Sequence, residues 1–165
     1  MIIKYKKNSI YFDEFKLKCC IGKAGIRKNR VEGDKTTPIG TFKLGDLYYR
    51  KDRNYKIVTN FKKIAIKNTM GWCNDSSSIY YNRLINIQKL KKISYEKLYR
   101  NDYKYDFLIP IHFNYYKTKK YKGSAIFIDL TKNYKSTSGC IGLKKKDFLI
   151  LLKIVTKNSK MIIKD

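Results

Sequence analysis

The segment best suited to chemistry is residues 136–143, which reads Ser-Thr-Ser-Gly-Cys-Ile-Gly-Leu. The glycine before Cys140 lets the backbone approach an acyl group closely, and backbone N–H groups there can face a developing oxyanion. Cys140 becomes a nucleophile if its thiol ionises below its free pKa of about 8.5. On these local features alone, a cysteine flanked by glycines is also typical of a small buried residue. Both interpretations stay open at this point.

The other cysteines are Cys19, Cys20 and Cys73. Their spacing fits no metal site, since adjacent cysteines in a strand point to opposite faces and cannot easily bind one ion. The chain has a single histidine, His112, which also argues against zinc, so we expect no metal and no cofactor. A disulfide among the first three cysteines is compatible with the sequence, which does not select a pairing.

The elements that would position Cys140 lie on both sides of it. Residues 107–115 and 124–130 predict two strands joined by a basic loop. After Cys140, apolar residues at 148, 149, 151, 152 and 155 follow helical spacing, with Asp147 near the helix start. Residues 161–163 predict a final strand that closes the fold.

The rest of the chain is also rich in strand and turn signals. Residues 2–21 predict a hairpin of two strands joined near Lys7–Asn8, and a glycine-rich segment leads into a strand at 41–44. Residues 57–66 predict one or two short strands, and residues 68–86 a long ordered loop. Ser94 is a candidate cap for a short helix through Arg100, with Glu96 in its first turn. The fold class expected is mainly β (α+β), with short helices packed alongside.

The composition indicates one globular domain with a basic surface. The 165 residues are enough for a hydrophobic core, and the net charge is +25, from 38 Lys+Arg against 13 Asp+Glu. Such an excess attracts polyanions, but the lysines are spread through every segment, and no zinc-finger, helix-turn-helix or RNA-binding signature occurs. We expect no specific nucleic-acid partner. Residues 1–10 contain no apolar run long enough for a signal peptide or membrane span.

Seven motifs, in order along most of the chain, resemble one known family. They are residues 22–26 with 32–42 (GKAGI, EGDKTTPIGTF), 48–53 (YYRKDR), 71–75 (GWCND), 81–83 (YNR), 96–100 with 105–106 (EKLYR, YD), 123–127 (GSAIF) and 137–140 (TSGC). This pattern is similar to that of the L,D-transpeptidase catalytic domain family (YkuD-like), in its short single-domain branch. The resemblance implies a single β-sandwich-type domain over residues 1–165.

The resemblance also implies an activity. Members of the family form L,D cross-links in peptidoglycan, so the implied partners are wall stem peptides, with no cofactor. By position, Cys140 would attack a stem-tetrapeptide carbonyl and pass the thioester to an acceptor amine. Gly139 and Ser138 would supply oxyanion donors, and Gly123 and Ser124 would contact substrate. The family's role implies the cell envelope or periplasm, although the visible start of the chain is equally compatible with the cytoplasm; we expect a monomer.

One position departs from the family pattern. The family has a histidine after the GSAIF motif, and here that position holds Asp129. A histidinium would lower the thiol pKa, whereas a carboxylate raises it by like-charge repulsion. If His112 pairs opposite Phe127, His112 and Asp129 share a face as diagonal neighbours at about 7–8 Å, and His112 is then a candidate base. The alternative is a strand histidine bonded to backbone, in a strand that Pro110 places at an edge or bulge.

Further candidates for substrate contact are aromatic and basic. Trp72, with Tyr80, Tyr81 and Tyr115, either lines a groove for the stem peptide or packs in the core. Arg83 and Arg100 either bind a peptide carboxylate or form structural ion pairs. Three functions follow as hypotheses: an acyl-transfer enzyme acting through Cys140, a catalytically lapsed domain that binds wall peptides, and a polyanion-binding basic protein.

Overall fold

The structure, a computed structural model, describes residues 1–53, 56–90 and 92–164. The chain opens with β1 (Ile2–Lys6), β2 (Ser9–Phe12) and β3 (Phe15–Cys20). Lys7 and Asn8 make the predicted turn with φ of 44° and 56°. A second turn at Asp13, which has a φ of 45°, splits the predicted second strand into two. The expected two-stranded hairpin is therefore a three-stranded meander.

The remaining elements alternate short strands with long connections. In chain order they are β4 (Ile26–Arg27), β5 (Thr37–Pro38), β6 (Gly40–Lys43), β7 (Leu47–Tyr49), β8 (Lys63–Ala65), β9 (Met70–Cys73), β10 (Leu84–Asn86), β11 (Tyr95–Lys97), β12 (Phe107–Pro110), β13 (Phe127–Leu130), β14 (Ile141–Leu143), α1 (Lys145–Ile154) and β15 (Lys160–Ile163). This confirms the mainly β fold class, and the described part of the chain contains one helix.

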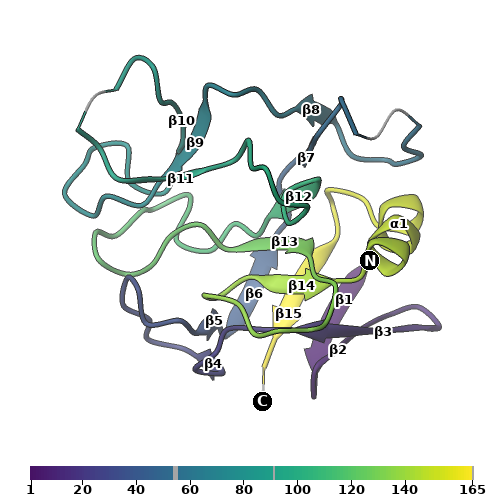
Figure 1. Cartoon of the computed structure of the whole chain (residues 1–165). Coiled ribbons are helices and arrows are strands. Elements are labelled where there is room, and N and C mark those ends of the chain that lie inside the picture. The colour runs from purple at the N-terminus through teal and green to yellow at the C-terminus, as the bar shows by residue number, and fades with distance from the viewer. Residues whose placement is uncertain (54–55, 91, 165) are drawn as a thin grey trace.

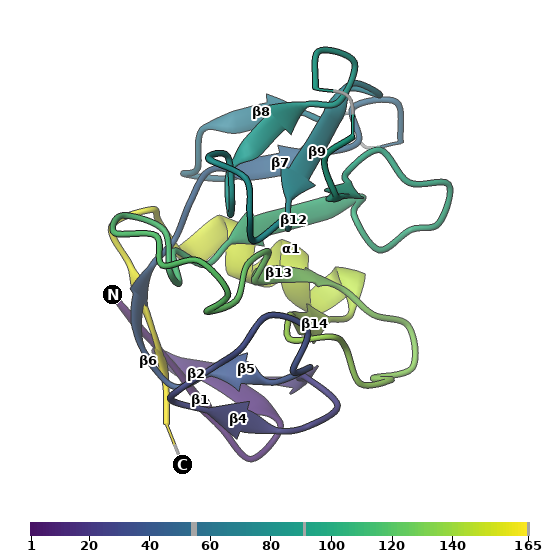
Figure 2. The ribbon, with the colours of Figure 1, turned by 90° about the vertical axis from the view of Figure 1, so that its left-hand side faces the viewer.

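Ten strands form one curled sheet, in the order β6-β15-β1-β2-β3-β14-β13-β12-β7-β8. A three-stranded sheet (β10-β9-β11) and the pair β4–β5 complete the described strands. Figure 2 shows β13 and β14 between an upper part with β7, β8 and β9 and a lower part with β1, β2, β4 and β5. The parallel pair β13–β14 therefore lies at the centre of the fold (Figure 1).

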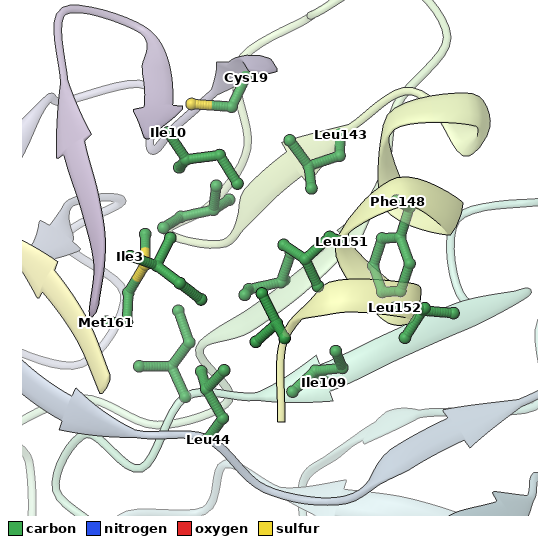
Figure 3. Close-up of a cluster of buried hydrophobic side chains, with 14 of the residues drawn as sticks. Ile3, Ile10, Cys19, Leu44, Ile109, Leu143, Phe148, Leu151, Leu152 and Met161 are labelled. Atoms are coloured by element: carbon green, nitrogen blue, oxygen red, sulfur yellow. The ribbon is translucent and has the colours of Figure 1, made fainter. Parts of the chain in front are cut away.

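The helix α1 follows directly after β14 and covers the central strands. Phe148, Leu151 and Leu152 are fully buried, which confirms the helical apolar spacing predicted from the sequence. Figure 3 shows these side chains gathered with Ile109 and Leu143, and with residues of the meander and of β15 further along the cluster. The helix thus anchors the segment that follows Cys140 to the main core.

Two predictions about the middle of the chain were wrong. Residues 68–86 hold β9 and β10 instead of a loop, and residues 94–100 hold β11 instead of a helix. β9 pairs with both neighbours, and Glu96 of β11 lies opposite Trp72. Ser94 donates to the side chain of Asn74 and caps no helix. Pairing with a distant strand therefore overrides the local capping signal.

Candidate functional site

Cys140 lies directly before β14, and only 8% of its surface is exposed. Its thiol donates to the carbonyl oxygen of Ala125 over 3.5 Å, and its sulfur accepts the N–H of Phe127 at 3.4 Å. Both partners belong to the 123–127 motif that leads into β13. The thiol is thus fixed between the two central strands, at the wall of a cavity of about 590 Å³.

The turn before Cys140 is held by two threonines. Thr137 accepts the N–H of Gly139 at 3.1 Å and donates to the carbonyl oxygen of Cys140 at 2.6 Å. Thr37 donates to the carbonyl oxygen of Gly139 at 2.8 Å. Gly139 has a φ of 139°, and a Cβ there would lie 2.8 Å from the carbonyl oxygen of Thr36. Only glycine fits this turn, as the sequence pattern indicated for a different reason.

Asp129 lies beside Cys140, on the neighbouring strand. β13 and β14 are parallel with Asp129 opposite Gly142, so Asp129 and Cys140 lie two positions apart across the pair. The two side chains interact closely enough that each shifts the pKa of the other. Asp129 is 5% exposed, and burial raises the pKa of its carboxyl well above the usual range, with the charge of Glu96 adding to the effect.

The pKa of the Cys140 thiol is raised as well. Burial raises the pKa of Cys140 well above its ordinary value, and the negative charges of Asp129 and Glu96 raise it further. Both groups therefore favour their neutral forms, and the thiol ionises less readily than that of an exposed cysteine.

Glu96 and Tyr105 join this cluster, and the sequence analysis assigned no site role to either. Glu96 accepts a hydrogen bond from the Tyr105 hydroxyl, and both side chains line the cavity with Cys140 and Asp129. Burial raises the pKa of Glu96, although the Tyr105 bond opposes the shift. The EKLYR and YD motifs contain both residues, but only the pairing of β11 with β9 brings Glu96 inside.

His112 is not brought to Cys140. Phe127 pairs with Pro110, so the register that would have placed Phe127 opposite His112 is wrong by two residues. The His112 ring stacks on Tyr115 at 4.3 Å, and its Nδ1 lies 3.0 Å from the Tyr116 hydroxyl. It lines a separate cavity of about 390 Å³. The predicted strand 107–115 ends at Pro110, which explains why His112 leaves the sheet.

The aromatic and basic candidates make contacts within the fold. Trp72 and Tyr81 are 3% and 2% exposed, and the Tyr81 hydroxyl donates to Glu32 and accepts the N–H of Gly123. Arg83 donates to the carbonyl oxygens of Asn82 and Tyr115. Arg100 pairs with Asp102 at 2.6 Å and lines the cavity of Cys140. Ser124 and Ser138 line that cavity as well.

Asn82 is a positioning residue that we did not single out from the sequence. Its side-chain oxygen accepts the indole N–H of Trp72 at 2.9 Å and the N–H of Ala125 at 3.1 Å. Its amide nitrogen donates to the carbonyl oxygens of Phe113 and Asn114. Asn82 is buried with a φ of 58°, a conformation that asparagine tolerates better than most residues. Asn82 therefore holds Ala125 in position, and the carbonyl oxygen of Ala125 accepts the hydrogen bond from the Cys140 thiol.

The remaining sequence expectations concern metals, disulfides and membranes. All four cysteines are free and buried. Within residues 1–53, 56–90 and 92–164, no cluster of three His, Cys, Asp or Glu side chains is arranged to hold a metal ion. The one described helix is too short and too polar to cross a membrane.

A family model described as YkuD, the L,D-transpeptidase catalytic domain, matches residues 2–163. No curated protein and no solved structure matches the chain.

Proposed function

Because this chain belongs to the YkuD family of L,D-transpeptidase catalytic domains, we propose that it transfers peptidoglycan stem peptides through a thioester on Cys140. The family implies peptidoglycan peptides as substrates and the cell envelope as the place of action. The finer assignment rests on the cavity that Cys140, Asp129 and Glu96 line together.

The observation that carries the proposal is that Asp129 and Cys140 line one cavity and that each shifts the pKa of the other. A general base must lie within hydrogen-bond reach of the proton that it removes, and its pKa should lie near the working pH. For the first condition, Asp129 is the carboxyl that lies two positions from Cys140 across the β13–β14 pair, and its raised pKa brings it closer to the second condition. A carboxylate of ordinary acidity would be too weak a base for a buried thiol.

The proposed reaction has two steps. The sulfur of Cys140 attacks the donor carbonyl while its proton passes to the Asp129 carboxylate, and Asp129 returns that proton to the departing amine as the C–N bond breaks. The acceptor amine then attacks the thioester, a proton from its nitrogen passes through Asp129 to the leaving sulfur, and a new amide forms. Since the N–H of Gly139 already donates to Thr137, we propose the backbone N–H of Cys140 as oxyanion donor.

The effect of the neighbouring carboxyls on the thiol pKa also favours a second candidate function. The Asp129 and Glu96 carboxyls raise the thiol pKa, whereas the histidine of the family would lower it. The domain would then bind stem peptides without reacting. Replacing Asp129→His separates the two candidates, because a lapsed site would gain acyl transfer and an adapted site, whose turn and cavity suit a carboxyl, would lose it.

The proposed function is tested by turnover. The full chain is incubated with a stem tetrapeptide and an acceptor amine, and the released terminal amino acid and the cross-linked product are measured by mass spectrometry. We expect both products in equal amounts with the native chain and neither with Cys140→Ser. Equal product from Cys140→Ser would show that the thiol is not the nucleophile.

A further inference from the structure

The cavity of about 390 Å³ that His112 lines is rich in cationic side chains. Its three lysines come from two strands and a turn: Lys43 ends β6, Lys160 begins β15, and Lys157 lies between α1 and β15. All three are exposed, and none of them forms an ion pair in the described part of the chain. Three ammonium groups therefore face one cavity without a carboxylate bound to any of them.

Two of these lysines lie directly opposite each other on paired strands. β6 and β15 run antiparallel and side by side (Figure 1), and their register pairs Lys43 with Lys160. Residues paired in this way point to the same face of the sheet, and like charges directly opposite each other destabilise the pair. An anion bound between the two ammonium groups would remove this repulsion. The register therefore indicates a site for a negatively charged ligand.

His112 adds a polar group to the same wall. Its backbone N–H donates to the carbonyl oxygen of Lys43 at 2.9 Å, which ties it to the end of β6. Its Nδ1 lies 3.0 Å from the Tyr116 hydroxyl, whereas its Nε2 makes no hydrogen bond to any residue that the structure describes. A Cβ at Gly45 would lie 3.0 Å from Nε2, so the glycine leaves room for this edge of the ring at the cavity wall.

The charges around the cavity favour a ligand with two negative charges. The three lysines outnumber Asp46, the carboxylate of the described lining, so the excess is two positive charges. Burial lowers the pKa of His112, and Lys43 and Arg83 lower it further while Asp46 opposes them, so the imidazole favours its neutral form. A phosphate monoester carries about −1.5 to −2 charge at pH 7 and three strong acceptor oxygens. It matches this excess better than a single carboxylate does.

An exposed aromatic ring lies beside these cations. Tyr116 contacts the His112 ring edge to face at 5.3 Å, and it is 64% exposed. The Nζ of Lys43 lies 5.6 Å from the centroid of the same ring. An aromatic face next to a cation suits a ligand with an apolar face close to its anionic group, as a sugar ring that carries a phosphate has.

We propose that this cavity binds the phosphate monoester of a sugar, with the phosphate between Lys43 and Lys160 and the sugar ring on Tyr116. The site goes beyond the proposed acyl transfer, because its described lining shares no residue with the cavity of Cys140. A sugar phosphate in this cavity and a peptide at Cys140 can therefore be bound at the same time.

The test uses the fact that His112 is the one histidine of the chain, so its imidazole NMR signals need no assignment. The signals of the full chain are followed at constant pH and ionic strength while glucose 1-phosphate, inorganic phosphate or glucose is added. We expect a saturable shift with glucose 1-phosphate, binding of inorganic phosphate that is about tenfold weaker, and no shift with glucose. The bound phosphate should also raise the pKa of His112, because a nearby negative charge favours the imidazolium.

Variants of the paired lysines test the position of the phosphate. Lys43→Gln and Lys160→Gln should each weaken binding of glucose 1-phosphate about tenfold, since each removes a charge-assisted hydrogen bond. Lys16→Gln is the matched control, because Lys16 lies 5.7 Å from the Tyr11 ring centroid and outside the cavity, and it should change the affinity less than about twofold. Without phosphate, Lys43→Gln should unfold at a temperature no lower than the native chain, since it removes the like-charge pair.

A variant of the aromatic ring tests the sugar. Tyr116→Ala should bind glucose 1-phosphate and inorganic phosphate equally, because the ring that distinguishes them is gone. In the native chain, equal affinity for the two would overturn the assignment of a sugar.

Three results would overturn the site itself. They are a shift that does not saturate, a shift with glucose that matches the shift with its phosphate, and equal losses of affinity in Lys16→Gln and Lys43→Gln. The first and the third would indicate general attraction of anions to a basic chain. None of these results depends on Cys140, so each leaves the proposed acyl transfer unaffected.

Discussion

The Asp129 carboxyl, on β13, and the Cys140 thiol, directly before β14, line one cavity, and each shifts the pKa of the other. Asp129 stands at the position where the resemblance to the family led us to expect a histidine. Burial and the neighbouring Glu96 raise the pKa of both groups, which favours the neutral form of each. The chemistry of this protein depends on whether that pair can pass one proton to a substrate.

The rate at which the Cys140 thiol is alkylated should depend on the neighbouring Asp129 carboxylate. Asp129→Asn removes a negative charge that raises the thiol pKa, so alkylation of Cys140 at pH 8 should become several-fold faster. Acyl transfer should nevertheless fall by about 10²–10⁴-fold, because the general base is lost. Alkylation is followed by intact mass, with Asp46→Asn, in the cavity of His112, as control. Slower alkylation of Asp129→Asn would contradict the assigned electrostatics.

Stability should depend on pH through the same carboxyl. A carboxyl whose pKa is raised by folding stabilises the fold at low pH, and this contribution is lost as the pH rises from the unfolded value of about 4 toward the folded value. Asp129→Asn should therefore unfold at a temperature close to that of the native chain at pH 4, and several degrees higher at pH 8. The expected gain is about 1–3 kcal/mol. Thermal unfolding of the native and variant chains at both pH values measures this gain. A gain in unfolding temperature that does not depend on pH would show that Asp129 is not the titrating group.

The asparagine that holds the site together should be sensitive to truncation. Asn82→Ala removes bonds to Trp72, Ala125, Phe113 and Asn114, and places alanine at a φ of 58°. We expect a loss of about 2–4 kcal/mol in the free energy of unfolding, since buried partners are left unpaired. Asn86→Ala, at an exposed position, should cost less than about 1 kcal/mol. Chemical denaturation of the two variants measures the difference, and similar losses would remove the special role of Asn82.

The single histidine should be dispensable for the reaction. His112 lines a different cavity and contacts Tyr115 and Tyr116, so His112→Ala should change the acylation rate of Cys140 less than about threefold. Single-turnover acylation of the native and variant chains measures this. A loss of about 100-fold or more would mean that His112 reaches the thiol in a conformation other than this one.

Local sequence patterns predicted those elements whose structure is determined by a few neighbouring residues. The structure contains three such features, each determined by a few neighbouring residues. They are the apolar spacing of α1, the turn at Lys7–Asn8 and the glycine before Cys140. β9 and β11 were missed because each is only three or four residues long, and each depends on pairing across about 25 residues of chain.

Only part of the site could be predicted from the sequence, because pairing between distant strands brings some of its residues together. Cys140 and Asp129 were found because a family pattern marks both positions. Glu96 was assigned to a helix, and its placement beside Asp129 depends on the register of β11 against β9. A two-residue error in the β12–β13 register was enough to misplace His112.

Formation of the thioester tests the central claim most directly. The folded, reduced chain is incubated with a stem tetrapeptide at pH 7 and pH 9 and its intact mass is recorded, with Cys140→Ala in parallel. The account predicts an acyl adduct on the native chain that is absent from the variant and forms faster at pH 9, where more of the Asp129–Cys140 pair has lost its proton. No adduct at either pH, in protein that binds the peptide, would contradict catalysis and leave a peptide-binding domain.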